Sequence, residues 1–247
     1  MKQQKVKIYD IIYDMKSGIS FRINEKKYPV TITRKKMKRI VIKMNRTGGI
    51  LVSCPHFCSD KVVLGFLEKN RPWLEKTASE LDANDQELGI SACLEFKRTY
   101  FKGILYSLKQ NADLKTPYLI SNDTIYYQND PKSAVEKLLR DNYSYIEGEF
   151  ERVKTLFKDS ITQSTYLTIR KMKSRWGSCN YKTGRITINR ALVHLPAKLL
   201  HYVMFHEFTH LLYPNHGKLF RAFLKKHLPD FRESERELKK YSFLLNI

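Results

Sequence analysis

The pattern of hydrophobic and polar positions predicts long helices in the C-terminal half of the chain. Apolar residues recur about every 3.6 positions over 131–157 and again over 195–212. The second stripe covers more than half of the helix circumference, so we expect this helix to be buried. Pro214 should end it, because the residue before a proline is pushed out of the helical region. Two further helices are expected, at 217–227 and 231–244.

Alternation of apolar and polar residues predicts short strands in the remaining parts of the chain. In the N-terminal part we expect strands at 19–24, 28–33, 39–44 and 49–53, with a hairpin turn at 45–48. Helices should follow at 59–70 and 72–81. Later strands are expected at 94–97, 104–108, 118–120, 124–127, 166–170 and 184–189.

Together these elements predict an α+β protein with two domains. Residues 1–128 are expected to form a smaller, mixed and β-rich N-terminal domain. Residues 129–247 should form a catalytic domain of helices packed on a small sheet. The length of 247 residues and the hydrophobic content of 42% suit one or two domains with a real core.

Composition narrows the class of protein further. No stretch of about 20 apolar residues is present, so we expect no membrane span. No apolar segment follows the charged N-terminus, and four cysteines are too few for a disulfide framework, which predicts a soluble, cytoplasmic protein. The formal charge of +20 favours polyanionic partners, so nucleic acid could bind the basic surface. The densest basic run is 34–39.

The most specific chemistry lies in the buried helix, where the chain reads His206-Glu207-Phe208-Thr209-His210 and then reaches His216. Histidines four residues apart share one face of a helix and can bind one tetrahedral zinc ion. The turn after Pro214 should bring His216 back as the third ligand. Three protein ligands leave a position open, which is typical of catalytic zinc.

Glu207 lies next to the first ligand and can take a proton from a metal-bound water. The predicted chemistry is hydrolysis by an activated water. The ligands alone do not choose between a peptide carbonyl and a phosphoryl group as the substrate.

A second unusual stretch precedes the helix. Arg175, Trp176, Gly177 and Ser178 form a polar loop in which glycine permits a sharp turn or a close approach. We interpret this loop as a wall of the active-site cleft. Cys179 is not favoured as a nucleophile, because the metal already supplies the water, although it could act as a fourth ligand.

Metal-bound imidazoles usually donate their second N–H to a carboxylate or carbonyl. Asp230 and Glu233 are the carboxylates that we expect in this role, with Asn215 as a further neighbour of the ligands. His194 precedes the helix and could reach the cleft as an electrophile. His201 lies on another face and is expected to be a core or surface residue.

Several of these motifs occur together in one known family. They are Trp176-Gly177-Ser178-Cys179, Ile188-Asn189, His206-Glu207-x-x-His210 with Asn215-His216, and Leu228-Pro229-Asp230-Phe231. The combination resembles the YgjP-like family of bacterial metal-dependent hydrolases, most strongly over 130–245. The basic segment at 34–53 and the segment Arg71-Pro72-Trp73-Leu74 resemble its N-terminal part.

The resemblance implies a zincin-type domain related to SprT-like peptidases. Zinc would lie on His206, His210 and His216, Glu207 would be the general base, and Asn189 would belong to the cleft. The histidine spacing equals that of the metzincins, but Tyr213 replaces their glycine and no methionine follows Met204. In a gluzincin-type site, Glu233 or Glu237 would replace the third histidine.

Three functions follow from these observations. The first is a zinc metallopeptidase in which the strand at 184–189 is an exposed edge that pairs with an extended peptide. The second is a nucleotide hydrolase, since one branch of the family is described as a UTP pyrophosphatase, with phosphates held by Lys173, Arg175, Arg185 and Arg190. The third is a peptidase recruited to nucleic acid by its charge.

Overall fold

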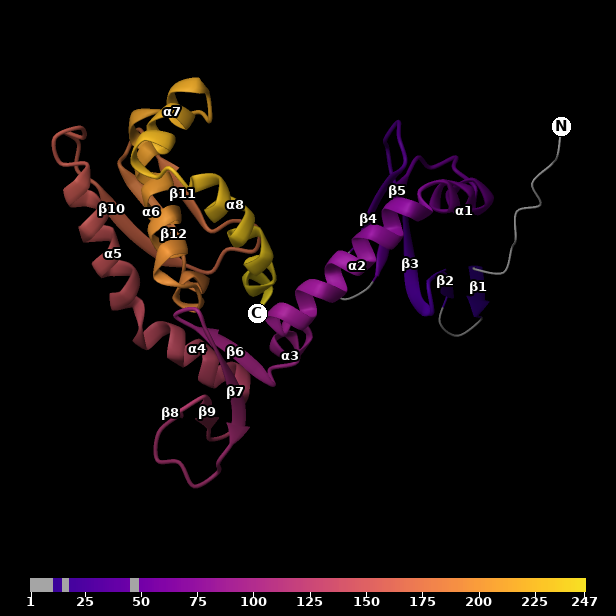
Figure 1. Cartoon of the computed structure of the whole chain (residues 1–247), viewed down its shortest axis with the longest axis horizontal. Helices are drawn as coiled ribbons and strands as arrows, with labels where there is room; N and C mark the ends of the chain where they lie inside the picture. The colour runs from indigo at the N-terminus through magenta and orange to yellow at the C-terminus, as the bar shows by residue number, and fades with distance from the viewer. Residues whose placement is uncertain (1–10, 15–17, 45–48) are drawn as a thin grey trace. The chain divides into compact units, whose positions relative to one another are not determined.

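The computed structural model describes residues 11–14, 18–44 and 49–247, and it divides the chain into two compact units (Figure 1). The units are Met1–Gly89 and Ile90–Ile247. Helices and small sheets in both units confirm the predicted α+β class. The expected domain boundary at 128/129 lies inside the second unit, because strands before it share a hydrophobic core with the helix after it.

The first unit is a mixed sheet covered on one face by two helices. Its strand order is β1-β2-β3-β5-β4, with β3 parallel to β5 and the other pairs antiparallel. The bounds are β1 (Ile11–Asp14), β2 (Gly18–Ile23), β3 (Lys26–Arg34), β4 (Val41–Met44), β5 (Ile50–Cys54), α1 (Asp60–Lys69) and α2 (Arg71–Leu88). The predicted turn at 45–48 lies outside the described residues.

The core of this unit follows from strand alternation. Phe21, Val30 and Ile50 point to one face and are almost fully buried against Leu67 of α1 and Leu74 of α2. The second helix is longer than expected and ends where Gly89 adopts a φ of 59°, which glycine reaches without steric cost.

The second unit begins with a short helix and a four-stranded sheet of order β6-β7-β9-β8. The sheet packs on the next helix through Leu108 and Ile125, which share a core cluster with Val135 and Leu138. The elements are α3 (Ile90–Leu94), β6 (Arg98–Phe101), β7 (Ile104–Gln110), β8 (Tyr118–Ser121), β9 (Thr124–Tyr127) and α4 (Pro131–Asp141). The expected strand at 94–97 is not formed, because α3 ends there and β6 starts at Arg98.

The helix predicted over 131–157 is in fact two helices, α4 and α5 (Tyr143–Leu156). They meet at Asn142, whose side-chain Nδ2 donates a hydrogen bond of 2.9 Å to the carbonyl of Leu138. Asparagine competes for backbone hydrogen bonds in this way, and it is a weak helix former.

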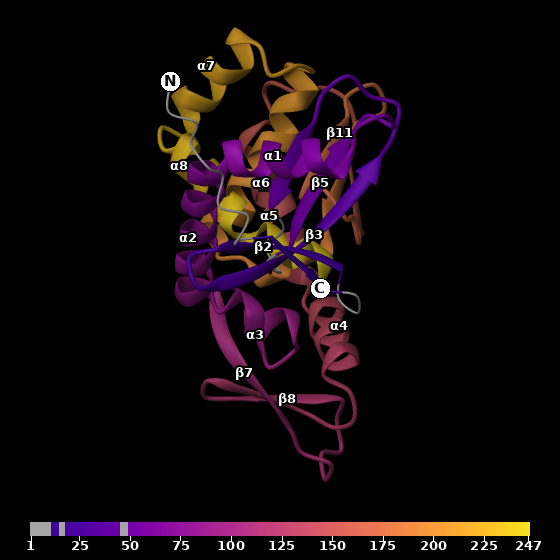
Figure 2. The same cartoon turned by 90° about the vertical axis from the view of Figure 1, so that its right-hand side faces the viewer.

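A second sheet and the remaining helices build the rest of this unit. The sheet order is β10-β12-β11, with β12 parallel to β10 and antiparallel to β11. In Figures 1 and 2, α7 and the four-stranded sheet lie at opposite ends of the unit. The elements are β10 (Tyr166–Arg170), β11 (Gly177–Asn180), β12 (Arg185–Asn189), η2 (Arg190–His194), α6 (Ala197–Leu212), α7 (Lys218–His227), α8 (Phe231–Lys240) and η3 (Tyr241–Asn246).

The sheet order corrects one sequence-based expectation. The strand at 184–189 was expected to be an exposed edge, but β12 is central and is paired on both sides. The edge that faces the cleft is β11, which the hydrophobic pattern did not predict. Its sequence, Gly-Ser-Cys-Asn, has no large apolar residue that would mark a strand.

Helix α6 is the buried centre of the second unit. Phe205 and Phe208 lie 4.8 and 5.5 Å, between ring centroids, from Phe157 after α5. The hydrophobic stripe predicted from the sequence is therefore the packing surface of this helix. None of the helices in the described part of the chain combines the length and hydropathy that a membrane-spanning segment needs.

Candidate metal centre

Three histidines converge at the C-terminal end of α6. His206 and His210 lie one turn apart on the helix, and His216 approaches from the segment before α7. One ligand nitrogen of each lies within 4.8 Å of the other two. His206 Nε2 and His216 Nε2 are 2.9 Å apart. The predicted group of three imidazoles is therefore brought together by the fold.

A single aromatic ring supports all three imidazoles. Phe220 of α7 is 1% exposed, and its centroid lies 5.0, 4.7 and 4.7 Å from those of His206, His210 and His216. Burial, together with the neighbouring histidines, lowers the pKa of His206 to about 3 and also lowers that of His210. These two rings are thus held in the neutral form that binds metal.

The outward nitrogens of two of these rings have partners. The Nδ1 of His210 lies 3.3 Å from the carbonyl oxygen of Tyr213, and the Nδ1 of His206 lies 3.5 Å from the hydroxyl of Tyr202. That hydroxyl donates to Glu235 Oε1 at 3.2 Å. A partner on Nδ1 leaves Nε2 as the metal-binding atom.

The residues expected to support the ligands lie elsewhere. Glu233 Oε2 is 3.8 Å from Lys198 Nζ, and Asp230 lies just before α8, where its backbone carbonyl accepts from the amides of Glu233 and Ser234. Asn215 is exposed, and its carbonyl accepts from Gly217 N. The carboxylate that reaches His206 is Glu235, through Tyr202. Tyr202 is four residues before His206, so helical spacing could have predicted this contact.

Glu207 is buried beside the histidines and is 7% exposed. Burial raises its pKa to about 8, and the nearby Arg175 guanidinium opposes that rise. Gly177 of β11 lies directly against the carboxylate. A Cβ atom at this glycine would stand 2.6 Å from both Cγ and Oε1 of Glu207, so only glycine fits without a shift.

An open cavity of about 340 Å³ joins these groups. Three of the predicted cleft residues, Arg175, Gly177 and Ser178, line it together with the three histidines and Glu207. The sequence-based prediction missed Tyr181 and Pro214, which also line it. Cys179 lines it as well, but burial and the nearby Glu207 raise its pKa to about 12, which disfavours the thiolate.

Two predicted cleft residues have a different place. Asn189 is 1% exposed and stabilises the loop 172–175 through its side chain. Its Nδ2 donates to the carbonyls of Met172 at 2.6 Å and Arg175 at 3.0 Å. Its backbone amide donates to the carbonyl of Trp176 at 2.8 Å. The Trp176 side chain is not among the groups that line the cavity. Asn189 therefore positions the cleft wall and does not form it.

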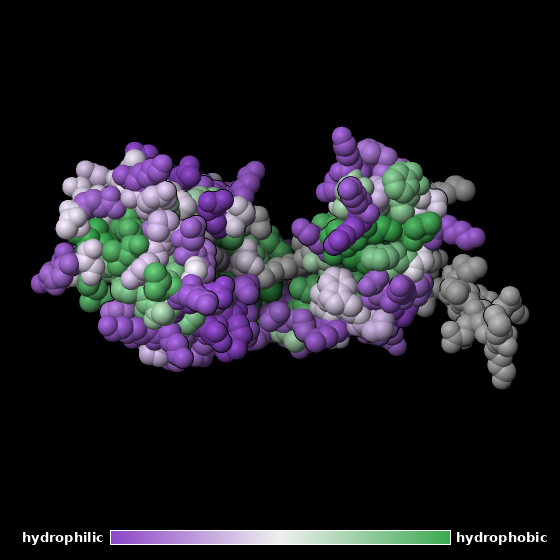
Figure 3. Space-filling model, turned by 90° about the horizontal axis from the view of Figure 1, so that it is seen from above, coloured by the Kyte–Doolittle hydropathy of each residue, from purple (hydrophilic) through white to green (hydrophobic). Residues whose placement is uncertain are grey.

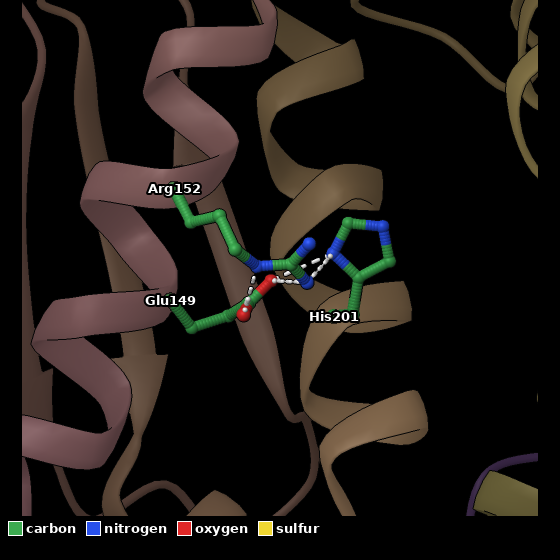
Figure 4. Close-up of polar contacts among 3 residues, drawn as sticks. All are labelled: Glu149, Arg152 and His201. Carbon is green, nitrogen blue, oxygen red and sulfur yellow. Dashed lines mark hydrogen bonds and ion pairs between the residues drawn. The ribbon is translucent and has the colours of Figure 1, made fainter.

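Two other histidines of this unit are fully accounted for by local contacts. His194 is 1% exposed, its Nδ1 bonds the carbonyl of Tyr100, and burial lowers its pKa to about 4, so it does not reach the cleft. On α6, His201 Nδ1 lies 2.6 Å from Glu149 Oε1 of α5, and Arg152 makes two hydrogen bonds to the same carboxylate (Figure 4).

Comparisons with known proteins found two solved structures that match part of the chain. The metallopeptidase zymogens jannalysin of Methanocaldococcus jannaschii and abylysin of Pyrococcus abyssi have crystal structures that match the chain, with TM-scores of 0.35 and 0.34 and identities of 25% and 24%. The alignments cover 38% and 39% of this chain and 94% of each of theirs. No curated protein sequence matches.

The family comparison is more extensive. The model of the family described as YgjP-like, metallopeptidase domain matches residues 38–241. This range contains the three histidines, Glu207 and the whole cleft wall, and it also reaches into the first unit. The resemblance noted in the sequence is thereby confirmed, and the chain belongs to the YgjP-like metallopeptidase family.

Proposed function

We propose that this protein is a zinc metallopeptidase that cleaves peptide bonds with a metal-activated water. The observation that carries the proposal is the convergence of three imidazole nitrogens beside one buried carboxylate in an open cavity. His206, His210 and His216 would hold the zinc ion, and Glu207 would be the general base.

The histidines fit such an ion. Two nitrogens bound at ~2.0–2.1 Å to one tetrahedral zinc are about 3.3 Å apart. His206 Nε2 and His216 Nε2 are 2.9 Å apart, so a small spreading of the rings is enough. The described residues offer this group of three histidines, without a fourth side-chain ligand, which is the donor set of an open catalytic site.

The chemistry divides between the ion and the protein. Bound zinc lowers the pKa of water toward ~7 and polarises the carbonyl under attack. Glu207 accepts the proton of the attacking water on its carboxylate and then passes it to the leaving nitrogen. Burial raises the pKa of Glu207 to about 8 in the absence of a cation, and a bound zinc ion would lower it toward the working pH, which suits a group that both takes and gives a proton.

The exposed edge of β11 supports a peptide substrate. Among the residues that the structure describes, this strand pairs with β12 on one side only, and three of its residues, Gly177, Ser178 and Cys179, line the cavity. An exposed edge strand can hydrogen-bond an extended peptide along its backbone. A peptide bound there would run past Glu207, because Gly177 touches its carboxylate.

The nucleotide alternative has weaker support. Four basic residues were expected to hold phosphates, but Arg175 is the one that lines the cavity within the described residues. Arg190 Nη2 instead lies 2.8 Å from Glu136 Oε1, and that ion pair is only partly exposed. One cation beside a carboxylate does not make a triphosphate site.

The test combines substrate choice with one substitution. The zinc-loaded chain should cleave casein or a quenched peptide library, should stop when a chelator is added, and should leave UTP intact. Glu207→Gln should reduce peptide cleavage by roughly 10²–10⁴-fold while zinc stays bound. Glu151→Gln, on the exposed side of α5, is the matched control and should keep full activity. Phosphate release from UTP without peptide cleavage would overturn the proposal.

A further inference from the structure

The first unit carries a strong local excess of positive charge. Between Arg22 and Lys43 the sequence has nine lysines and arginines and one carboxylate, Glu25. Two of the nine are neutralised, since Lys26 pairs with Asp82 and Arg34 with Asp60. The other seven are exposed and form no ion pair within the described residues: Arg22, Lys27, Lys35, Lys36, Lys38, Arg39 and Lys43.

Part of this charge lies on the face of the sheet opposite α1 and α2. Residues paired across neighbouring strands project from the same face. The register pairs Arg22 with Lys27, and it places Leu51 between Thr31 and Lys43. We call the set Arg22, Lys27, Thr31, Thr33, Val41, Lys43 and Leu51 the basic face, and all seven side chains are exposed.

The remaining charge lies at one end of the same sheet, where the parallel strands β3 and β5 finish. The segment 35–40 connects the end of β3 to the start of β4 and passes the end of β5, which lies between them. Lys36, Lys38 and Arg39 therefore lie at the end of the sheet where β5 finishes. The turn 55–58 also starts there, and Arg34 ties it down through a 3.1 Å hydrogen bond from Nε to the carbonyl of Cys58.

This turn presents an unusual aromatic side chain. Phe57 is 90% exposed, although transfer of a phenyl ring out of water is favourable. It stands next to the basic segment, because Cys58 is held by Arg34 and Lys35 N donates to the carbonyl of Cys54. Figure 3 shows purple, hydrophilic side chains bordering green, hydrophobic surface on this unit.

We propose that the basic face and the adjoining end of the sheet, which includes the turn with Phe57, bind single-stranded nucleic acid. Proteins that bind single strands combine a cationic track for the phosphates with an aromatic side chain on which a base stacks. The seven cations, on the sheet and in the segment after β3, and Phe57 in the adjoining turn supply both parts. Thr31 and Thr33 add hydroxyl groups between the cations, and such groups bond phosphate and sugar oxygens.

Other polyanions fit this surface less well. Helices that bind membrane surfaces bury a continuous apolar face, whereas the basic face has two partly exposed aliphatic residues, Val41 at 41% and Leu51 at 39%. An acidic peptide would be matched by the cations but would leave Phe57 without a stacking partner. A base and its phosphate satisfy both groups at once.

Fluorescence anisotropy of the full chain tests the proposal. The probes are labelled single-stranded DNA and RNA of about 20 nucleotides, longer than the ~4–16 nucleotides that one OB-fold domain binds. Binding should weaken between about 50 and 200 mM salt, with a slope near −0.7 per phosphate contacted. Phe57→Ala should weaken single-strand binding about tenfold, and Phe57→Trp should restore it.

Paired variants separate this site from general charge. Lys36→Gln with Lys38→Gln removes two cations from this end of the sheet and should reduce the salt slope by about 1.4. Lys69→Gln with Lys76→Gln removes two exposed cations from α1 and α2 and should leave binding unchanged. All of these side chains are exposed, so melting temperatures should stay close to that of the unsubstituted chain.

The remaining outcomes would overturn the proposal. Failure of both oligonucleotides to bind at low salt would do so directly. An equal loss of affinity in the two double variants would show diffuse charge attraction without a site. Binding to anionic vesicles that depends on Phe57, with no binding to oligonucleotides, would identify a membrane surface as the partner. None of these outcomes bears on the peptidase assay.

Discussion

Helix α6 carries two kinds of histidine, which differ in the group that the Nδ1 atom contacts. His201 gives its Nδ1 to a carboxylate, Glu149, that Arg152 also binds. His206 and His210 contact a tyrosine hydroxyl and a backbone carbonyl through Nδ1, and their other nitrogens face one another and His216. His201 therefore lies beside an anionic group, whereas burial and the neighbouring histidines lower the pKa of His206 and of His210.

The difference shows that one helix can carry a histidine that stabilises packing and other histidines that are placed to bind a metal ion. The contacts of His201 join α6 to α5 and complete a local ion-pair network (Figure 4). Burial raises the pKa of Glu149, but hydrogen bonds from His201 and Arg152 outweigh it and hold the pKa below its usual value. In the described part of the chain, the Nδ1 atoms of His206 and His210 contact no carboxylate directly, so these rings keep their lone pairs for a cation.

The largest effect should come from removing a ligand. His210→Ala should weaken zinc binding by well over the ~10–100-fold that changes outside the ligand sphere cost. His201→Ala, five positions away from the first ligand, should leave zinc affinity unchanged and lower only thermal stability. Competition with a chromophoric chelator measures both. Equal losses of zinc affinity in the two variants would contradict the comparison.

A third kind of histidine gives a pH-dependent prediction. Burial lowers the pKa of His194 to about 4 from a usual value of 6.5, so below pH 6.5 the unfolded chain takes up a proton that the folded chain refuses. Stability from this residue is complete above about pH 6.5 and falls by ~3 kcal/mol as the pH drops to about 4. Urea unfolding with chelator present should show a smaller loss in His194→Gln. An unchanged pH dependence in that variant would contradict the prediction.

The contact between β11 and Glu207 predicts a defect in catalysis alone. Gly177→Ala should displace the carboxylate, and a misplacement of about 1 Å can cost ~10²-fold in rate. Zinc affinity should not change, because the histidines are untouched. Gly148→Ala is the matched control, since a Cβ atom there meets nothing within 4 Å. Full activity of Gly177→Ala would show that the close approach has no role in catalysis.

The smallest effect concerns the partner of His206. Tyr202→Phe removes the hydroxyl between His206 and Glu235 and should weaken zinc binding about tenfold, the lower end for such partners. Tyr213→Phe removes a hydroxyl from the end of the same helix but keeps the carbonyl that His210 contacts. It should therefore bind zinc normally. Similar zinc affinities in the two variants would assign Tyr202 a packing role.

The candidate centre could be predicted because its information is local. Histidine spacing, the apolar stripe of α6 and Pro214 lie within about twenty residues, and helical geometry converts that spacing into position. The strand β11 could not be predicted in the same way, because four small or polar residues become a strand only through pairing with β12. The central place of β12 also depended on that pairing.

The supporting residues illustrate a second limit. Asp230 and Glu233 were chosen because acids are common partners of metal-bound histidines, but sequence distance does not say which side of α8 faces α6. The structure brings Glu235 to Tyr202 instead. Asn189 was assigned to the cleft by resemblance, and only its burial and its bonds to Met172 and Arg175 show that it is a support.

The hold of Asn189 on the preceding loop has a further consequence for how this cleft can evolve. Its amide nitrogen recognises main-chain carbonyls at residues 172 and 175, which every amino acid provides, and Lys173 and Ser174 between them are exposed. Side chains along the loop can therefore be exchanged while its path stays the same. Substrate preference can drift at this wall without disturbing the histidines.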